Sequence, residues 1–94
     1  MNQYFVYIMS SPNKNSIYIG VTNDLQKRVI QHKSKTINGF TSKYNCVHLV
    51  YFESFNEISK AIAREKQLKK WNRKWKEELI FTTNKDWLDL AELW

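Results

Sequence analysis

The sequence contains little cysteine, proline or glycine and no long apolar run. Its 94 residues include one Pro and two Gly, which excludes a collagen-like or linker-like chain. The single cysteine, Cys46, cannot form an internal disulfide or a Cys-rich zinc site, and this is typical of a reducing compartment. The longest apolar run, Tyr4–Met9, is far too short to span a membrane, and the first residues lack the basic and apolar segments of a signal peptide. We therefore expect one soluble, cytoplasmic domain over residues 1–94.

The chain is basic, and its charge is unevenly distributed. Fifteen Lys and Arg against nine Asp and Glu give a net charge of +6, while 43% hydrophobic residues are ordinary for a folded domain. Residues 60–76 hold eight basic residues and one acid, whereas residues 77–94 hold five acids and one Lys. This segregation indicates one cationic face, for which nucleic acid is a natural partner. On charge alone, a merely solubilising role is an equal alternative.

Three segments have the β-branched and aromatic composition of strands, namely residues 4–9, 16–21 and 47–52. The turn-forming residues 10–15 predict that the first two make an antiparallel hairpin. A turn centred near Asn13 would place Tyr7 and Tyr18 roughly opposite each other. A basic loop over residues 34–46 precedes the third strand.

Capping residues and helical periodicity predict the remaining elements. The predicted helices are residues 24–33, capped by Asn23 with Gln26; residues 57–71, capped by Asn56; residues 73–81, after a break near Asn72; and a short amphipathic helix carrying Trp87, Leu90, Ala91 and Trp94. The expected fold class is α+β, with a small three-stranded, mainly antiparallel sheet flanked by helices in the order ββαβα plus C-terminal helices.

A carboxylate lies in the predicted apolar stripe of the 57–71 helix. Steps of three and four residues from Ile58 and from Ala61 both pass through Glu65. A lone buried carboxylate is costly unless it is paired or binds a cation. An ion pair with a neighbouring Arg or Lys, or a position at the wet edge of the stripe, is the commoner outcome, and a metal ligand or catalytic carboxylate is the alternative.

The 24–33 helix repeats this pattern, because Leu25, Arg28, Val29 and His32 share one face. The planar fork of Arg28 suits phosphate, although a salt bridge is its ordinary use. For His32, a solvated or hydrogen-bonded histidine at a helix end is the commoner alternative.

Two strand tyrosines add hydroxyl groups to this set. Taken singly, Tyr7 and Tyr18 are most often packing residues with a wet hydroxyl. Together with Arg28, His32 and Glu65, they fit phosphodiester hydrolysis, which needs an activated water, neutralised phosphate charge and a stabilised leaving oxygen.

The same residues form an ordered motif. It consists of Phe5-Val6-Tyr7, ten further residues, Tyr18-Ile19-Gly20, a helix with Arg28 and His32, and later Ala63-Arg64-Glu65 running on to Trp71. In this order and spacing, about residues 4–90 resemble the GIY-YIG nuclease superfamily, most closely its small stand-alone bacterial proteins. They are more distantly similar to the N-terminal domain of the excinuclease C subunit and to some homing endonucleases.

The resemblance implies a small central sheet flanked by helices and cleavage of DNA by a single-metal mechanism. It implies that one of the two tyrosines, Tyr7 in preference to Tyr18, deprotonates or orients the attacking water, and that the other holds the water or the scissile phosphate. Arg28 would stabilise charge on the phosphate, and His32 would contact it or assist proton transfer. Glu65 would bind one Mg²⁺ or Mn²⁺. A nearby Arg and the metal are expected to lower the pKa of the tyrosine base.

Other residues are assigned by their place in the same pattern. Gly20 is expected to let the strand approach the site without a side chain. Because the sequence shows no second DNA-binding domain, target choice is expected from the basic segment, from DNA shape or from a protein partner. The expected substrate-binding and supporting residues are Gly20, Lys43, Tyr44, Lys69 and Asn84, with Asn72 as the alternative to Asn84.

Two other functions remain open. The basic segment, with Trp71 and Trp75, suits a nucleic-acid-binding module without turnover, although packing is the commoner role of such Trp residues. The C-terminal stripe of Trp87, Leu90 and Trp94 suits docking of a partner, although packing on the chain's own sheet is commoner in so short a domain.

Overall fold

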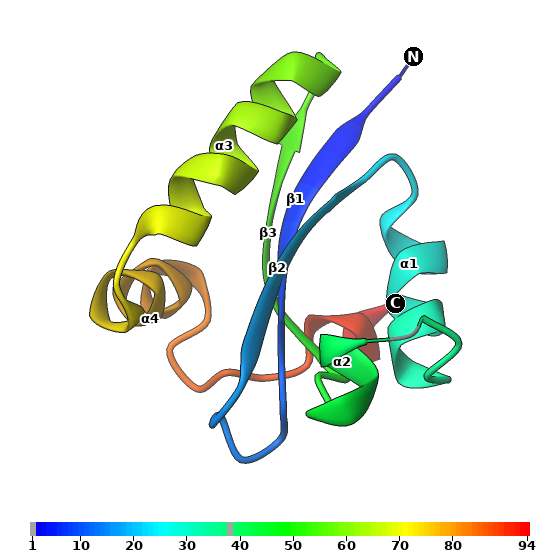
Figure 1. The fold of residues 1–94 in the computed structure, drawn as a ribbon, viewed down its shortest axis with the longest axis vertical. Helices are drawn as coiled ribbons and strands as arrows, with labels where there is room; N and C mark the ends of the chain where they lie inside the picture. Colours follow the sequence, from blue (N-terminus) through cyan, green and yellow to red (C-terminus); the bar gives the residue numbers. More distant parts are fainter. Residues whose placement is uncertain (1, 38) are drawn as a thin grey trace.

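The protein is built on a three-stranded antiparallel sheet in the spatial order β2-β1-β3 (Figure 1). The computed structural model describes residues 2–37 and 39–94. The strands are β1 (Tyr4–Ser10), β2 (Ile17–Thr22) and β3 (His48–Phe55). The hairpin and the α+β class expected from the sequence are confirmed, and the third strand is longer than predicted.

Helices cover both faces of this sheet. Figure 1 shows them in two groups, one on each side of the strands. On one face lie α3 (Ile58–Lys70) and α4 (Arg73–Thr83); on the other lie α1 (Leu25–Lys33), the short α2 (Phe40–Lys43) and a 3₁₀ helix, η1 (Leu90–Leu93).

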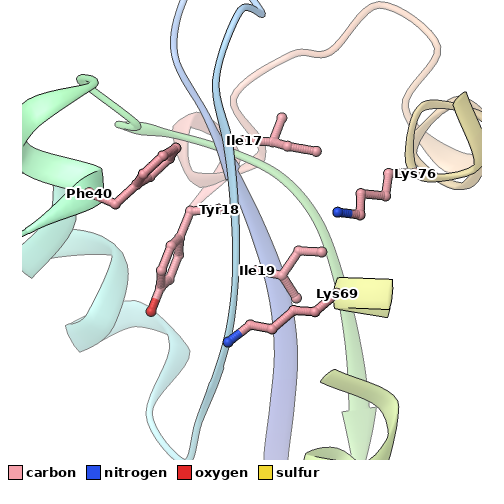
Figure 2. Close-up of a pocket in the computed structure, with 6 residues that line it drawn as sticks. All are labelled: Ile17, Tyr18, Ile19, Phe40, Lys69 and Lys76. Atoms are coloured by element: carbon pink, nitrogen blue, oxygen red, sulfur yellow. The ribbon is translucent and has the colours of Figure 1, made fainter. Parts of the chain in front are cut away.

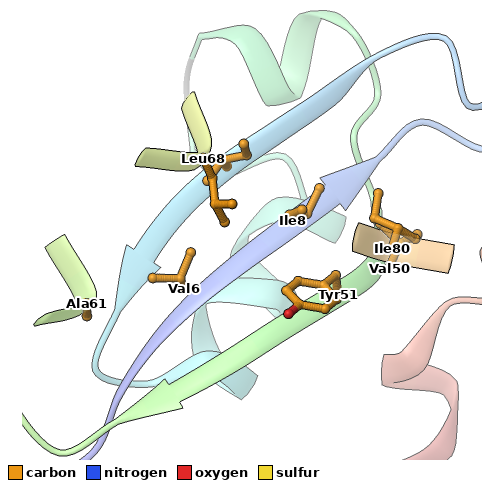
Figure 3. Packing of buried hydrophobic residues seen from close by; sticks show 8 residues of the cluster. Val6, Ile8, Val50, Tyr51, Ala61, Leu68 and Ile80 are labelled. Carbon is orange, nitrogen blue, oxygen red and sulfur yellow. The ribbon is translucent and has the colours of Figure 1, made fainter. Parts of the chain in front are cut away.

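The core between the sheet and α3 and α4 is apolar (Figure 3). Because side chains alternate along a strand, β1 sends Val6 and Ile8 to this face. Burial of each such side chain stabilises the fold by roughly 1.5–3 kcal/mol. The buried members are Val6, Ile8, Ile19, Val50, Tyr51, Ala61, Leu68 and Ile80.

The core on the opposite face has a polar residue at its centre. It contains Tyr7, Met9, Leu25, Val29, Cys46 and Leu49. A β-bulge shifts the pairing of β1 with β3 between Ile8 and Met9, which puts Leu49 on this face and both Val50 and Tyr51 on the other. The phenol of Tyr7 is therefore enclosed between the sheet and α1.

The start of α1 differs from the predicted cap. Asp24, rather than Asn23, caps the helix, and its carboxylate accepts the backbone N–H of Lys27 at 3.1 Å. The reason lies in the preceding turn, where the hydroxyl of Thr22 accepts the backbone N–H of Asp24 at 3.1 Å and fixes Asp24 at the cap.

The boundaries of α3 and α4 agree with the sequence only in part. α3 begins after Glu57, which makes no side-chain cap, so the predicted Asn56 cap is wrong. Asn72 ends the basic helix as predicted and caps α4. Ile58 and Ile62 are exposed, so the inward stripe of α3 is narrower than the sequence indicated.

Two loop regions also differ. The predicted loop over residues 34–46 contains α2, while Asn38 within it lies outside the described residues. The predicted amphipathic C-terminal helix is wrong, since only Leu90–Leu93 is helical and Trp87 has a φ of 54°. Here the chain passes from one face of the sheet to the other (Figure 1), so Trp87 packs with the α3 and α4 core and Leu90 with the opposite one.

Asp89 ties this C-terminal segment to α1 and β3. Its carboxylate is ion-paired with Lys33 and accepts the backbone N–H groups of Leu49 at 3.0 Å and Ala91 at 3.2 Å. Burial by itself would raise the pKa of Asp89, but these hydrogen bonds and the Lys33 charge outweigh it and hold the pKa below its ordinary value.

Replacing Asp89 with Asn is expected to lower the free energy of unfolding by about 1–3 kcal/mol at neutral pH. Because the folded-state pKa is lowered, the carboxylate's contribution is present above its ordinary pKa of 3.8 and is lost as the pH falls through the lowered value. Urea titrations across this range should show the two proteins converging at low pH. Glu92→Gln, an exposed change in the same helix, is the control; an equal loss in both variants would contradict the assignment.

Candidate active site

Tyr7 and His32 meet inside the core between β1 and α1. The Tyr7 hydroxyl lies 2.9 Å from His32 Nε2, and the two side chains are 0% and 1% exposed. Within residues 2–37 and 39–94, His32 Nδ1 is the buried side-chain nitrogen or oxygen that lacks a partner. A half-satisfied polar pair is costly to enclose, so its presence calls for a role other than packing.

The prediction that Tyr7 and Tyr18 lie opposite each other in the hairpin is wrong, because the strand register differs by two residues. Tyr7 pairs with Gly20, and Tyr18 pairs with Met9. Diagonal neighbours on one face of a sheet still come close. The rings of Tyr7, Tyr18 and His32 therefore form one cluster, with centroids 5.6–6.3 Å apart.

Gly20 provides the space for the Tyr7 ring. A Cβ built at Gly20 would lie 2.5 Å from the Tyr7 hydroxyl oxygen and 2.6 Å from its Cζ. The sequence predicted that Gly20 lets the strand approach the site without a side chain; in the structure the space that this leaves is occupied by the ring of Tyr7.

Replacing Gly20 with Ala is expected to lower the free energy of unfolding by about 1–3 kcal/mol, because the added methyl must displace the Tyr7 ring. Chemical denaturation measures this cost. A double-mutant cycle with Tyr7→Ala supplies the control, since the cost should largely disappear when the ring is absent. An undiminished cost in that background would show that strand propensity, and not the contact with Tyr7, is responsible.

Arg28 and Glu65 reach this cluster from helices on opposite faces of the sheet. Arg28 is half-buried on α1, and the Glu65 side chain on α3 is 17% exposed. The Arg28 guanidinium lowers the pKa of Tyr7 and the Glu65 carboxylate raises it, so both charges lie within electrostatic range of the phenol. Glu65 is also 3.6 Å from Lys69 Nζ, which is the ion pair that the sequence left open.

The environment separates the pKa values of the two hydrogen-bonded groups. Burial raises the pKa of Tyr7 to about 12, Tyr18 adds to the rise, and Arg28 opposes it. Burial and then the Arg28 charge lower the pKa of His32 to about 4. At neutral pH the pair is therefore a phenol and a neutral imidazole. The expected lowering of the tyrosine pKa is seen only in the contribution of Arg28, because burial outweighs it.

A groove of about 320 Å³ runs along the outer edge of β2 beside the cluster (Figure 2). Tyr18 belongs both to the aromatic cluster and to the groove lining, so the groove opens next to the buried Tyr7–His32 pair. Figure 2 shows the ammonium groups of Lys69 and Lys76 pointing toward β2. The lining residues are Ile17, Tyr18, Ile19, Phe40, Lys69 and Lys76.

Two of the predicted substrate residues do not line this groove. Lys43 and Tyr44 lie on α2 and at its end, where the Lys43 ammonium is 5.4 Å from the centre of the Tyr44 ring. Phe40 lines the groove in their place, and it was missed because α2 was predicted as loop. Lys76 was counted in the basic segment, but charge counting could not distinguish it from its neighbours.

Neither candidate Asn belongs to the cluster. The Asn84 amide is buried, donates to the carbonyl oxygens of Val50 at 3.0 Å and Leu88 at 2.8 Å, and accepts the Leu88 N–H at 2.9 Å. Its polar atoms are thus used to hold the chain after α4. Asn72 is used as the cap of α4.

The sheet, the flanking helices and this polar cluster define the class of protein. The chain belongs to the family of the GIY-YIG catalytic domain, which matches residues 3–78. This membership supports a nuclease-type function, with DNA as the partner and a divalent metal ion as the usual cofactor of such enzymes.

Individual relatives agree with this assignment. The chain is 36% identical to a UPF0213 protein of Haloquadratum walsbyi over 80 residues, which cover 84% of this chain and 89% of the relative. It is 34% identical to a UPF0213 protein of Staphylococcus saprophyticus, with coverages of 85% and 96%. The solution NMR structure of the UPF0213 protein BH0048 from Bacillus halodurans is similar in fold, with a TM-score of 0.60, 25% identity and coverages of 97% and 96%.

Among the residues that the structure describes, none forms a helix both long enough and apolar enough to cross a bilayer.

Proposed function

We propose that this protein is a metal-dependent endonuclease that hydrolyses phosphodiester bonds in DNA, with Tyr7 as the base. The observation that carries the proposal is the enclosed Tyr7–His32 hydrogen bond of 2.9 Å, within electrostatic range of Arg28 and Glu65. An apolar core has no need of such a pair, whereas hydrolysis needs a proton acceptor held beside a cation and a carboxylate.

His32 would act on the proton affinity of Tyr7. With its proton on Nε2, the neutral imidazole donates to the Tyr7 oxygen, and a lone pair remains unpaired at Nδ1. This hydrogen bond strengthens as negative charge develops on the phenol oxygen, so it favours the phenolate that takes the proton from water. His32 itself stays neutral, because its pKa is about 4.

Arg28 would neutralise charge at the same place. Its guanidinium already acts electrostatically on both Tyr7 and His32, and it does not deprotonate. A bidentate fork suits two phosphate oxygens, and the same charge opposes the rise in the pKa of Tyr7. Tyr18, at the border of the cluster and the groove, would hold the water or the phosphate by its hydroxyl.

Glu65 would hold one Mg²⁺ or Mn²⁺. In the described part of the chain, no three His, Cys, Asp or Glu side chains gather into one group, and Glu65 is the carboxylate that acts on the pKa of Tyr7. One carboxylate completed by water and substrate phosphate oxygens suits these hard cations. When bound, the ion would polarise the phosphate and stabilise the leaving oxygen. Without the ion, the Lys69 ammonium, 3.6 Å from the Glu65 carboxylate, partly neutralises that charge.

The proposal extends to the kind of DNA and to its context. The proposed role is the repair or processing of branched or damaged DNA, with a protein partner that contributes target choice.

Cleavage of a panel of labelled DNA substrates tests the proposal. The panel contains duplex, single-stranded, flap and branched forms, each with Mg²⁺, Mn²⁺ or EDTA. We expect cutting with either metal and none in EDTA, and the preferred substrate identifies the structure that is recognised. Binding without cutting on every member would support the alternative, a nucleic-acid-binding module without turnover.

A further inference from the structure

We infer that the groove along β2 is a binding site for the substrate backbone, in which Lys76 and Lys69 bind phosphates on one side of the cleaved bond. The inference rests on the proposed function, because it extends the same site. It adds a residue, Lys76, and a direction along which the nucleic acid leaves the reacting phosphate.

The direction follows from the order of groups along β2. Glu65 and Lys69 are one helical turn apart on α3, and Lys76 follows on α4. Figure 2 shows Lys69 beside Ile19 and the Lys76 ammonium between the levels of Ile19 and Ile17, further from Lys69 toward the hairpin turn. At a strand rise of about 3.3 Å per residue, Ile17 lies roughly 10 Å from Gly20 along β2, so the groove extends away from the cluster toward the hairpin turn.

The hairpin turn fixes the orientation of α4. The Arg73 guanidinium donates to the carbonyl oxygens of Lys14 and Asn15 in the turn between β1 and β2. Lys76 comes three positions after Arg73 and therefore lies on the same face of α4. Lys76 is therefore directed toward β2, and it is half-buried there.

Charge complementarity identifies the occupant. The groove lining contains two cations and no acid, with Ile17 and Ile19 as its apolar floor. Lys69 is shared with Glu65, but in the part of the chain that the structure describes no carboxylate lies within ion-pair distance of Lys76. A half-buried ammonium without a counter-charge, next to an apolar floor, suits the phosphates and sugars of a nucleic-acid backbone.

The other basic residues of the segment provide matched comparisons. Lys74 is exposed on α4 and lines a separate pocket with Glu77, Glu78 and Phe81. Lys70 is exposed at the end of α3 and does not line the groove. Of eight basic residues in 60–76, only Lys69 and Lys76 line the groove.

The test is the salt dependence of DNA binding in EDTA, where no cutting is needed. Labelled duplex and single strands of one sequence are titrated with the native protein, Lys76→Gln, Lys76→Arg and Lys74→Gln between 50 and 200 mM salt. For Lys76→Gln we expect the slope of log K against log salt to fall by about 0.7–0.9. Affinity should fall roughly tenfold at 50 mM and roughly threefold at 200 mM. Lys76→Arg and Lys74→Gln should keep the native slope within a few tenths.

Equal effects of Lys76→Gln and Lys74→Gln would overturn the inference, because the segment would then act only through its overall charge. Thermal unfolding of each variant separates lost binding from lost folding, and retention of the slope in Lys76→Arg confirms a charge contact. The outcome is distinguishable from failure of the proposed function. A protein that never cuts the panel but shows the Lys76 effect retains the binding site without the nuclease.

Discussion

Glu65→Gln is expected to reduce metal-dependent DNA cleavage by at least about 10³-fold, because the change removes the one protein carboxylate proposed to hold the cation. The substitution keeps the size of the side chain and its place between Ala61 and Leu68 on the inward side of α3. DNA binding in EDTA should be unchanged or tighter, since Lys69 loses its acidic partner. Initial cleavage rates over a range of Mg²⁺ concentrations measure the effect.

Glu57→Gln is the matched control for this change. Glu57 precedes the same helix and pairs with Lys60 at 2.9 Å, so its loss also removes one α3 ion pair. We expect native cleavage from this variant. Native cleavage from Glu65→Gln would show instead that Glu65 is only the partner of Lys69 and that the metal assignment is wrong.

Tyr7→Phe is expected to slow cleavage by about 10²–10⁴-fold, because it removes the proposed base and leaves the ring in place. Native cleavage should rise about tenfold per pH unit from pH 6 to 8, because the phenolate fraction grows in this proportion below a raised pKa of about 12. His32, with a pKa of about 4, should give no acid limb in this range. Single-turnover rates across this range, with the variant for comparison, measure both effects.

Tyr51→Phe controls for the loss of a buried hydroxyl. The Tyr51 hydroxyl donates to Glu53 on the opposite face of the sheet, away from the cluster. Both variants should lose about 1–3 kcal/mol of folding free energy, but only Tyr7→Phe should lose cleavage. A flat pH profile in the native enzyme, or equal cleavage by both variants, would remove Tyr7 from the role of base.

The local elements of the fold follow from short-range patterns in the sequence. β-Branched and aromatic runs predicted the strands, and helical patterning predicted the break near Asn72 that separates α3 from α4. The sequence mispredicted elements where a contact outside the local pattern determines the backbone conformation. Thr22 moved the α1 cap to Asp24, and the crossing of the C-terminal segment from one face to the other left Trp87 outside any helix.

The register of the hairpin could not be obtained from the position of its turn. Tyr7 lies opposite Gly20 instead of Tyr18. This two-residue shift places the Tyr7 ring over Gly20, where a Cβ would otherwise lie. The contact of the Tyr7 ring with Gly20 is a tertiary constraint, since only a residue without Cβ leaves room for the ring. Tertiary contacts also give Asn84 a role that the sequence did not predict. Its amide donates to the backbone carbonyl oxygens of Val50 and Leu88 and lies outside the cluster.

The sequence by itself determined the fold class and the family, because strand composition, helix periodicity and an ordered motif are properties of neighbouring residues. It also predicted the side chains that we propose for the chemistry. Only the tertiary structure decided that Tyr7 and His32 share a buried hydrogen bond, that burial raises the pKa of the phenol, and that Lys76 faces the groove. These properties depend on solvent exclusion and on the distances between elements far apart in the chain, which residue spacing does not encode.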